Sequence, residues 1–251
     1  MITLSSDFGS PYPAAMKGVI LSRSDARLID VSHDLPRHDV RQAAFWLTQT
    51  LPYFPPATHL VVVDPGVGTD RDVLAVETDD HVLVGPDNGV LVPVAEALSE
   101  QPTYFDVDHD PPESSTFHGR DVFAPLAAEI HEGGRRLLEE DDRFARTASY
   151  EDLQIPEPIV KGDRAEGIVV AVDDFGNAIT TIPGRVLDGH FGKQIEVNGT
   201  SVPIVETYAV LEEGRALVTV GSHGNVELAV NRGRGDVEFG VEPGDVLGIP
   251  I

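Results

Sequence analysis

The stretch Leu60-Val61-Val62-Val63-Asp64-Pro65-Gly66 decides the fold class of the first part of the chain. Four consecutive apolar residues, three of them β-branched, predict a buried strand, and the acid, proline and glycine that follow predict that it ends at Asp64. In an open α/β sheet, ligand chemistry takes place at the carboxyl ends of the strands. We therefore expect Asp64 to lie in a functional site.

The same pattern of a short apolar run followed by acid, amide and glycine recurs along the chain. It appears in three further segments: Ser6-Asp7-Phe8-Gly9, Gly85-Pro86-Asp87-Asn88-Gly89 and Asp173-Asp174-Phe175-Gly176-Asn177. Between the strand-like runs of the first half, helical periodicity begins at Asp39, which with Gln42 resembles a capping box, and again near Asp121. Alternation of strands and helices predicts a central-sheet α/β domain over residues 1–150.

The second half of the chain has a different pattern. Residues 151–164 are polar and contain prolines, which is typical of an interdomain connection. Residues 165–251 hold only short strands and turns, including a hairpin of 194–197 with 201–205 around the type I′ turn Asn198-Gly199, and a second hairpin of 217–220 with 226–230. We predict a small C-terminal β-barrel domain there.

Composition narrows the classes of function. The 251 residues carry a formal net charge of −24 and no cysteine, which disfavours nucleic acid as a partner and excludes disulfides and thiolate chemistry. Only Lys17, Lys161 and Lys193 stand against 42 acidic residues, a balance that suits concentrated salt. We therefore expect a halophilic source, with an ordinary acidic protein as the alternative. No run reaches the roughly 18 apolar residues of a membrane span, and the chain begins with a strand, so we expect a cytoplasmic protein.

Two other kinds of site are disfavoured by spacing. Gly66-Val67-Gly68 lacks the third glycine of a dinucleotide-binding loop. Asp64, Asp87, His118 and Asp121 show none of the tight spacings of a metal site, and Asp121 stands where a helix N-cap or first-turn acid belongs. We therefore expect no metal.

Taken together, the segments resemble the S-adenosylmethionine hydroxide adenosyltransferase family, the hydrolytic relatives of fluorinase and chlorinase. The resemblance spans nearly the whole chain, in order. The segments that carry it are Ser6-Asp7-Phe8-Gly9, Met16-Lys17-Gly18-Val19-Ile20, Val31-Ser32-His33, Val63-Asp64-Pro65-Gly66-Val67-Gly68, Gly85-Pro86-Asp87-Asn88-Gly89, Thr116-Phe117-His118-Gly119-Arg120-Asp121, Asp174-Phe175-Gly176-Asn177 and Gly221-Ser222.

The resemblance implies an enzyme that hydrolyses S-adenosyl-L-methionine, or its (R)-sulfonium epimer, to adenosine and L-methionine without a cofactor. It implies Asp64, Arg71 and His118 as the catalytic set, and a homotrimer with each site between two subunits. A halide-using adenosyltransferase is only the second candidate, because the halogenases lack the catalytic set and carry a halide-binding serine at the position of Gly119. A non-catalytic adenosine-binding module is the third.

The resemblance also assigns substrate contacts. Asp7 would bind the ribose hydroxyls, Phe175 would stack on adenine, and Asn177 would bind the polar edge of the base. Spacing alone, in contrast, favours a core position for Phe175. The methionine part is assigned to Asp173, Ser222 and Glu227, with the backbone from Val230 closing over the base.

Overall fold

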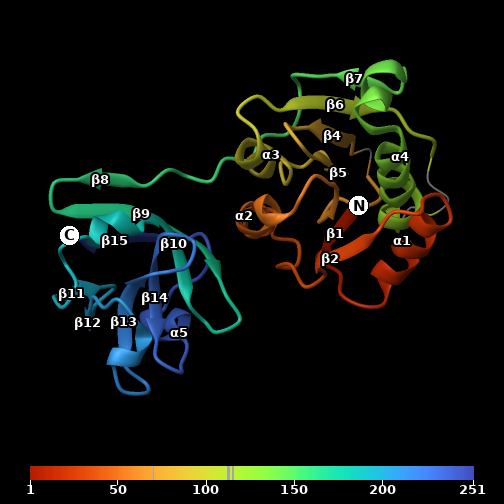
Figure 1. Cartoon of the computed structure of the whole chain (residues 1–251). Coiled ribbons are helices and arrows are strands. Elements are labelled where there is room, and N and C mark those ends of the chain that lie inside the picture. The colour runs from red at the N-terminus through yellow and green to blue at the C-terminus, as the bar shows by residue number, and fades with distance from the viewer. Residues whose placement is uncertain (70, 112–113, 115) are drawn as a thin grey trace. The chain divides into compact units, whose positions relative to one another are not determined.

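The computed structural model describes residues 1–69, 71–111, 114 and 116–251. The chain divides into two compact units, Met1–Gln154 and Ile155–Ile251, and the boundary falls within the predicted connecting segment 151–164 (Figure 1). Within the described part of the chain, no helix is long and apolar enough to cross a membrane.

The first unit is built on a mixed sheet that, over its described residues, has the strand order β2-β1-β3-β5-β4-β6-β7. Strands β2, β1, β3 and β5 run parallel, whereas β4 is antiparallel to both β5 and β6, and β7 is antiparallel to β6. The strands are β1 (Ile2–Ser6), β2 (Leu28–Ser32), β3 (Thr58–Val62), β4 (Val73–Glu77), β5 (Val82–Pro86), β6 (Thr103–Val107) and β7 (Phe144–Arg146).

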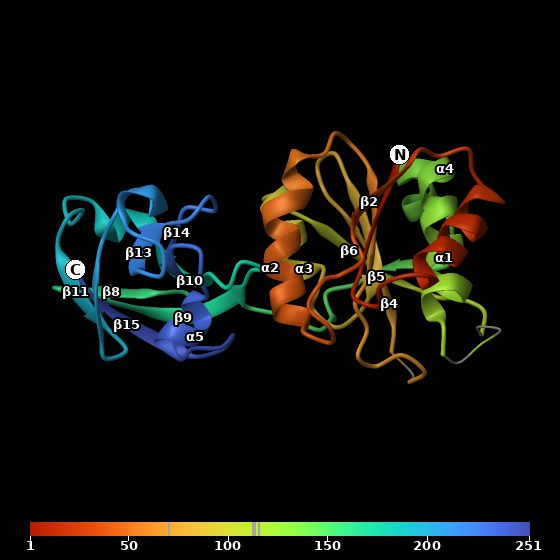
Figure 2. The ribbon, with the colours of Figure 1, turned by 90° about the horizontal axis from the view of Figure 1, so that it is seen from below.

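Helices cover both faces of this sheet. Helices α1 (Tyr12–Leu21) and α4 (Ala124–Glu140) lie on one face, and α2 (Val40–Thr50) and α3 (Val92–Leu98) lie on the other (Figure 2). Leu60 and Val62 of β3 belong to the core under α1 and α4, while Val61 and Val63 belong to the opposite core. Because both faces are covered, every residue of β3 is buried, including Thr58 and His59, and the run from Leu60 to Val63 is apolar without alternation, as the sequence predicted.

Two predicted helix features are confirmed. The Asp39 side chain caps α2 by accepting a hydrogen bond of 2.9 Å from the amide of Gln42. The helical region near Asp121 consists of the short π-helical segment η2 (Gly119–Phe123) followed by α4, with Asp121 as a first-turn acid. A 3₁₀ turn, η1 (Leu51–Tyr53), follows α2.

Sheet topology brings several polar segments to one edge. The carboxyl ends of parallel β1, β3 and β5 share that edge, and β6 ends there too because two antiparallel steps restore its direction. Antiparallel β4 begins at the same edge. The edge therefore gathers Asp7, Asp64, Asp87, Arg71 and the segment that leads to His118.

The second unit is built on antiparallel strands, as predicted, but it also contains three short helices where the sequence predicted only strands and turns. Its main order is β13-β14-β10-β9-β15, with β8 paired to β9, and β11–β12 forms a separate hairpin that joins β13 through the bridge Ile204–Val218. Both predicted hairpins are confirmed, and Asn198 and Gly199 have the positive φ values of 50° and 82° that a type I′ turn requires. The strands are β8 (Ile159–Lys161), β9 (Arg164–Val172), β10 (Ala178–Pro183), β11 (Gln194–Val197), β12 (Thr200–Pro203), β13 (Ala216–Val220), β14 (Asn225–Val230) and β15 (Val246–Pro250); the short helices are η3 (Gly184–Leu187), η4 (Tyr208–Val210) and α5 (Gly235–Phe239).

A buried chain of hydrogen bonds crosses the first sheet and predicts acid sensitivity. The hydroxyl of Thr3 lies 2.7 Å from Nδ1 of His59, whose Nε2 lies 2.9 Å from Nδ1 of His81. Burial lowers the pKa of His59 from 6.5 to about 3 and also lowers the pKa of His81. Between pH 6.5 and pH 3 the unfolded chain therefore binds more protons than the folded chain. The stabilising contribution of the neutral histidines is fully present above pH 6.5 and is lost as the pH falls.

For His59 this linkage is worth about 2 kcal/mol between pH 6.5 and pH 5. Urea denaturation of the wild type and of His59→Gln over that range checks it. We expect the variant to be less stable at neutral pH but to lose less stability on acidification. Parallel pH dependences in the two proteins would contradict the prediction.

Candidate active site

One cavity of the first unit, with a volume of about 450 Å³, opens at the sheet edge described above. It brings together three predicted site residues, Asp7, Asp64 and His118, from the segments after β1 and β3 and before η2. The remaining lining residues are Phe8, Tyr12, Arg37, His38, Val62, Val67, Ser114, Thr116, Phe117, Gly119, Arg120 and Phe123.

Arg71 is joined to this cavity through Asp64. Its Nε lies 3.2 Å from Oδ1 of Asp64, and the Asp64 side chain is only 5% exposed, so the ion pair is largely shielded from water. Oδ1 also accepts a hydrogen bond of 2.9 Å from the amide of Gly66. Arg71 itself lines a neighbouring cavity of about 350 Å³ together with Thr69, Asp72, Asp87 and Glu151. The arrangement holds a carboxylate beside a fixed positive charge.

His118 stands at the start of η2, next to the buried Gly119. A β-carbon at Gly119 would lie 3.2 Å from the sulfur of Met16 and 3.3 Å from the ring of Phe117, so even a small side chain would press on its neighbours. Gly119, which stands where the resemblance places a halide-binding serine, thus has no hydroxyl and little room for a side chain.

Asp7 follows β1, and its Oδ2 accepts a hydrogen bond of 2.8 Å from the amide of His38. Beside it the structure adds an aromatic cluster that the sequence did not reveal. The rings of Phe8, Tyr12 and Phe117 meet edge to face, with centroid distances of 6.2 Å from Phe8 to each of the others and 5.5 Å between Tyr12 and Phe117. Phe117 lies far from Phe8 and Tyr12 in the sequence, so only the fold brings the three rings together.

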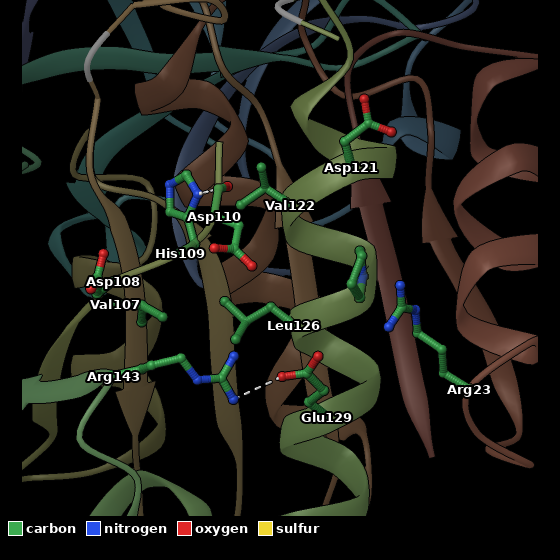
Figure 3. A pocket seen from close by; sticks show the side chains of 11 residues that line it. Arg23, Val107, Asp108, His109, Asp110, Asp121, Val122, Leu126, Glu129 and Arg143 are labelled. Carbon is green, nitrogen blue, oxygen red and sulfur yellow. Dashed lines mark hydrogen bonds and ion pairs between the residues drawn. The ribbon is translucent and has the colours of Figure 1, made fainter. Parts of the chain in front are cut away.

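The acids and histidine considered as a metal site do not gather around one point. Asp121 accepts a hydrogen bond from the amide of Ser114 and pairs with Arg120, which holds the pKa of its carboxyl below the usual range. Asp121 lines a further cavity of about 310 Å³, where an ion pair joins Arg143 to Glu129 (Figure 3). Among the described residues, no group of three or more histidine or acidic side chains is placed to hold a metal ion.

All six sequence-predicted site residues of the second unit line a single cavity of about 680 Å³: Asp173, Phe175, Asn177, Ser222, Glu227 and Val230. At its rim, residues 173–177 form a tight turn in which the Asp173 carboxylate accepts bonds of 2.8 and 2.9 Å from the amide and the side chain of Asn177. Gly176 closes the turn at a φ of +86°.

The core position that spacing favoured for Phe175 is wrong. The residue is 78% exposed because it lies in the tight turn, away from the alternating faces of β9 and β10. An exposed aromatic ring at the rim of a cavity is available to a planar ligand.

The second cavity also contains a residue that the sequence analysis missed. The hydroxyl of Tyr208, in η4, donates a hydrogen bond to Oε1 of Glu227, which is only 3% exposed on β14. Burial raises the pKa of Glu227 and that of Tyr208. Tyr208 lies in an irregular segment where no strand pattern or turn motif marks it.

Comparisons with known proteins point to one family over most of the chain. Residues 2–139 match the family described as SAM hydroxide adenosyltransferase N-terminal domain, and residues 167–248 match the corresponding C-terminal domain. The chain is 37% identical to a protein named (R)-S-adenosyl-L-methionine hydrolase from Salinispora tropica, with 98% of this chain and 96% of that protein covered. A protein of the same name from Thermus thermophilus is 38% identical, with 95% of each covered.

More distant and structural relatives extend the comparison. A fluorinase from Actinopolyspora mzabensis is 26% identical over 92% of this chain and 90% of the fluorinase. The solved structure of an uncharacterized conserved protein from Thermotoga maritima aligns over the full length of both chains with a TM-score of 0.86 and 32% identity.

Proposed function

The chain belongs to the SAM hydroxide adenosyltransferase family, and from this premise we propose that it is an enzyme that hydrolyses S-adenosyl-L-methionine to adenosine and L-methionine. The observation that carries the proposal is that Asp64 and His118 line one cavity while Arg71 is ion-paired to Asp64. The names of the relatives support the (R)-sulfonium epimer as the preferred substrate.

The difficult part of the reaction is the activation of water as the nucleophile. A water oxygen forms a bond to ribose C5′ while the bond from C5′ to sulfur breaks, and the sulfur leaves as neutral methionine without needing a proton. Water, with a pKa of about 15.7, must lose a proton to become adenosine's 5′-hydroxyl. We assign that proton to Asp64 or His118, and we assign to Arg71 the stabilisation of negative charge as it develops on the oxygen.

Substrate binding is proposed to use both cavities. Asp7 accepts hydrogen bonds from the ribose hydroxyls, the exposed ring of Phe175 stacks on adenine, and Asn177 binds the edge of the base. The methionine part goes to Asp173, Ser222 and Glu227, and Val230 closes over the base. Carboxylates near the sulfonium suit its positive charge.

The halide-using alternative is tested by the same assay. Purified protein is incubated with each sulfonium epimer, with and without chloride, and the nucleoside is identified by chromatography. Adenosine in both conditions supports hydrolysis. A 5′-halogenated nucleoside in chloride would support the second candidate, which Gly119 disfavours, and unchanged substrate would leave a binding module.

We also propose that catalysis needs no metal, because the leaving group is already neutral and three side chains are available to activate water. Turnover should be unchanged, within experimental error, after treatment with a chelator and gel filtration. The measurement is initial rate before and after treatment, with added Mg²⁺ and Zn²⁺ as controls. Loss of activity that a divalent ion restores would contradict the proposal.

The quaternary arrangement is proposed from the family resemblance. We propose a homotrimer in which each site takes its catalytic residues from the α/β unit of one subunit and its adenine contacts from the antiparallel unit of another. Halophilic character and a cytoplasmic location stay predictions from the sequence.

A further inference from the structure

The segment Gly85-Pro86-Asp87-Asn88-Gly89 has no role in the mechanism above, yet it hydrogen-bonds to Arg71 and to the carbonyl of Val63, the residue before Asp64. We propose that Asp87, Asn88 and Gly66 are positioning residues that fix this pair for catalysis. The inference rests on the proposed function. It identifies residues that would hold the catalytic residues Asp64 and Arg71 in place without contacting the substrate.

The first support is a hydrogen bond from Arg71 to this segment. Nη1 of Arg71 donates a hydrogen bond of 3.0 Å to the carbonyl oxygen of Asp87. The amide of Asp87 in turn donates a bond of 3.0 Å to the carbonyl of Asp72, directly after Arg71. These bonds extend the antiparallel pairing of β4 and β5, in which Val73 faces Pro86. The guanidinium is therefore held at two points, by Asp64 at Nε and by a main-chain carbonyl at Nη1.

The second support is a hydrogen bond from the same segment to the peptide group that precedes Asp64. Nδ2 of Asn88 donates a hydrogen bond of 2.8 Å to the carbonyl of Val63, and its Oδ1 accepts one of 3.1 Å from the amide of Val90. Val63 is fully buried. Asn88 thus fixes the main chain just before Asp64, and the adjacent Asp87 fixes the side chain of Arg71 that pairs with Asp64.

The third support is the absence of a side chain at Gly66. A β-carbon there would lie 2.3 Å from Nη2 and 2.7 Å from Nε of Arg71, far inside van der Waals contact. Gly66 is outside the set of glycines with positive φ, so its backbone conformation is open to alanine. Glycine stands at this position to make room for the guanidinium.

This explanation makes Gly66→Ala a test of Arg71 placement. The added methyl should displace the guanidinium from Asp64 and lower kcat by about 10²-fold, the scale of a misplacement of about 1 Å. KM should change little, because the ribose and base contacts are elsewhere. Gly18→Ala is the matched control: a β-carbon there meets no atom within 4 Å, and kcat should stay at the wild-type value.

The Arg71→Ala background separates positioning from general damage. If Gly66→Ala acts only through the guanidinium, it should cost nothing further once that group is gone. A further loss of kcat in this background would overturn the proposal. So would a large fall in the melting temperature of Gly66→Ala alongside its loss of kcat. Asn88→Ala should likewise lower kcat in the wild type and have little effect in Asp64→Asn.

A spectroscopic measurement keeps this inference separate from the proposed function. The side-chain Nε–H resonance of Arg71, assigned by its loss in Arg71→Lys, should shift in Gly66→Ala and stay in place in Gly18→Ala. If the wild type releases no adenosine but the resonance shifts, the proposed function fails and the positioning stands. If the wild type is active and Gly66→Ala keeps both its kcat and its resonance, the positioning proposal fails.

Discussion

Replacing Asp64 by Asn, Arg71 by Ala or His118 by Ala should lower turnover by about 10²- to 10⁴-fold, the range typical of lost acid-base catalysis. Adenosine affinity should stay close to that of the wild type, because the proposed base and ribose contacts are made by other residues. The measurements are kcat for the sulfonium substrate, adenosine Kd by calorimetry and melting temperature, all on the same preparations. Asp72→Asn, which changes an exposed acid directly before β4, is the matched control and should keep its turnover.

The three residues should also behave as one unit. Since Asp64 is paired to Arg71 and shares a cavity with His118, removing one group should disable what the others contribute. The double variant Asp64→Asn with His118→Ala should therefore lose far less than the product of the two single losses. Independent losses that multiply would argue for separate roles.

A structural explanation of the same residues makes a different prediction. Asp64 also accepts a hydrogen bond from Gly66, so it could serve only to hold that turn, with His118 packed beneath the cavity. In that case melting temperature and adenosine affinity would fall together with turnover. Near-normal turnover in both Asp64→Asn and His118→Ala would end the hydrolase mechanism.

The sequence could predict the parts of the fold that local chemistry decides. The continuous apolar run before Asp64, the cap at Asp39 and the Asn198-Gly199 turn each follow from residue types within a few positions, and the structure has all three. Strand direction is a different kind of information. That β4 runs against β5 is decided by packing across the sheet, and it is this reversal that sets Arg71 beside Asp64.

The same distinction separates the site residues that could be found from those that were missed. Asp64 and His118 lie in segments whose motifs can be recognised, so their presence in one cavity could be expected. Tyr208 has no such motif, and its bond to Glu227 joins residues 19 apart in sequence from η4 and β14. Phe175 was misjudged by spacing because a turn, unlike a strand, has no inner face to predict.

The second large effect is expected when two inactive proteins are mixed. Asp64→Ala removes the proposed water-activating carboxylate in the α/β unit, and Asn177→Ala removes the proposed adenine contact in the antiparallel unit. In a ring of three with heterologous interfaces, a site is intact when an Asn177→Ala subunit supplies the first cavity and an Asp64→Ala subunit supplies the second. Random exchange of equal amounts should then restore about a quarter of the wild-type rate, a rise of at least about tenfold over either variant alone at low substrate.

The experiment depends on showing that subunits exchange. The two variants carry different affinity tags, are mixed under mild denaturant and returned to buffer, and hybrid trimers are isolated by capture on both tags in turn. The hybrids should contain the recovered activity, whereas a mixture of two proteins that both carry Asp64→Ala should recover none. Because each chain in the active mixture carries one lesion, sites confined to single chains would all stay impaired. Hybrids without recovered turnover would therefore place the whole site within one chain.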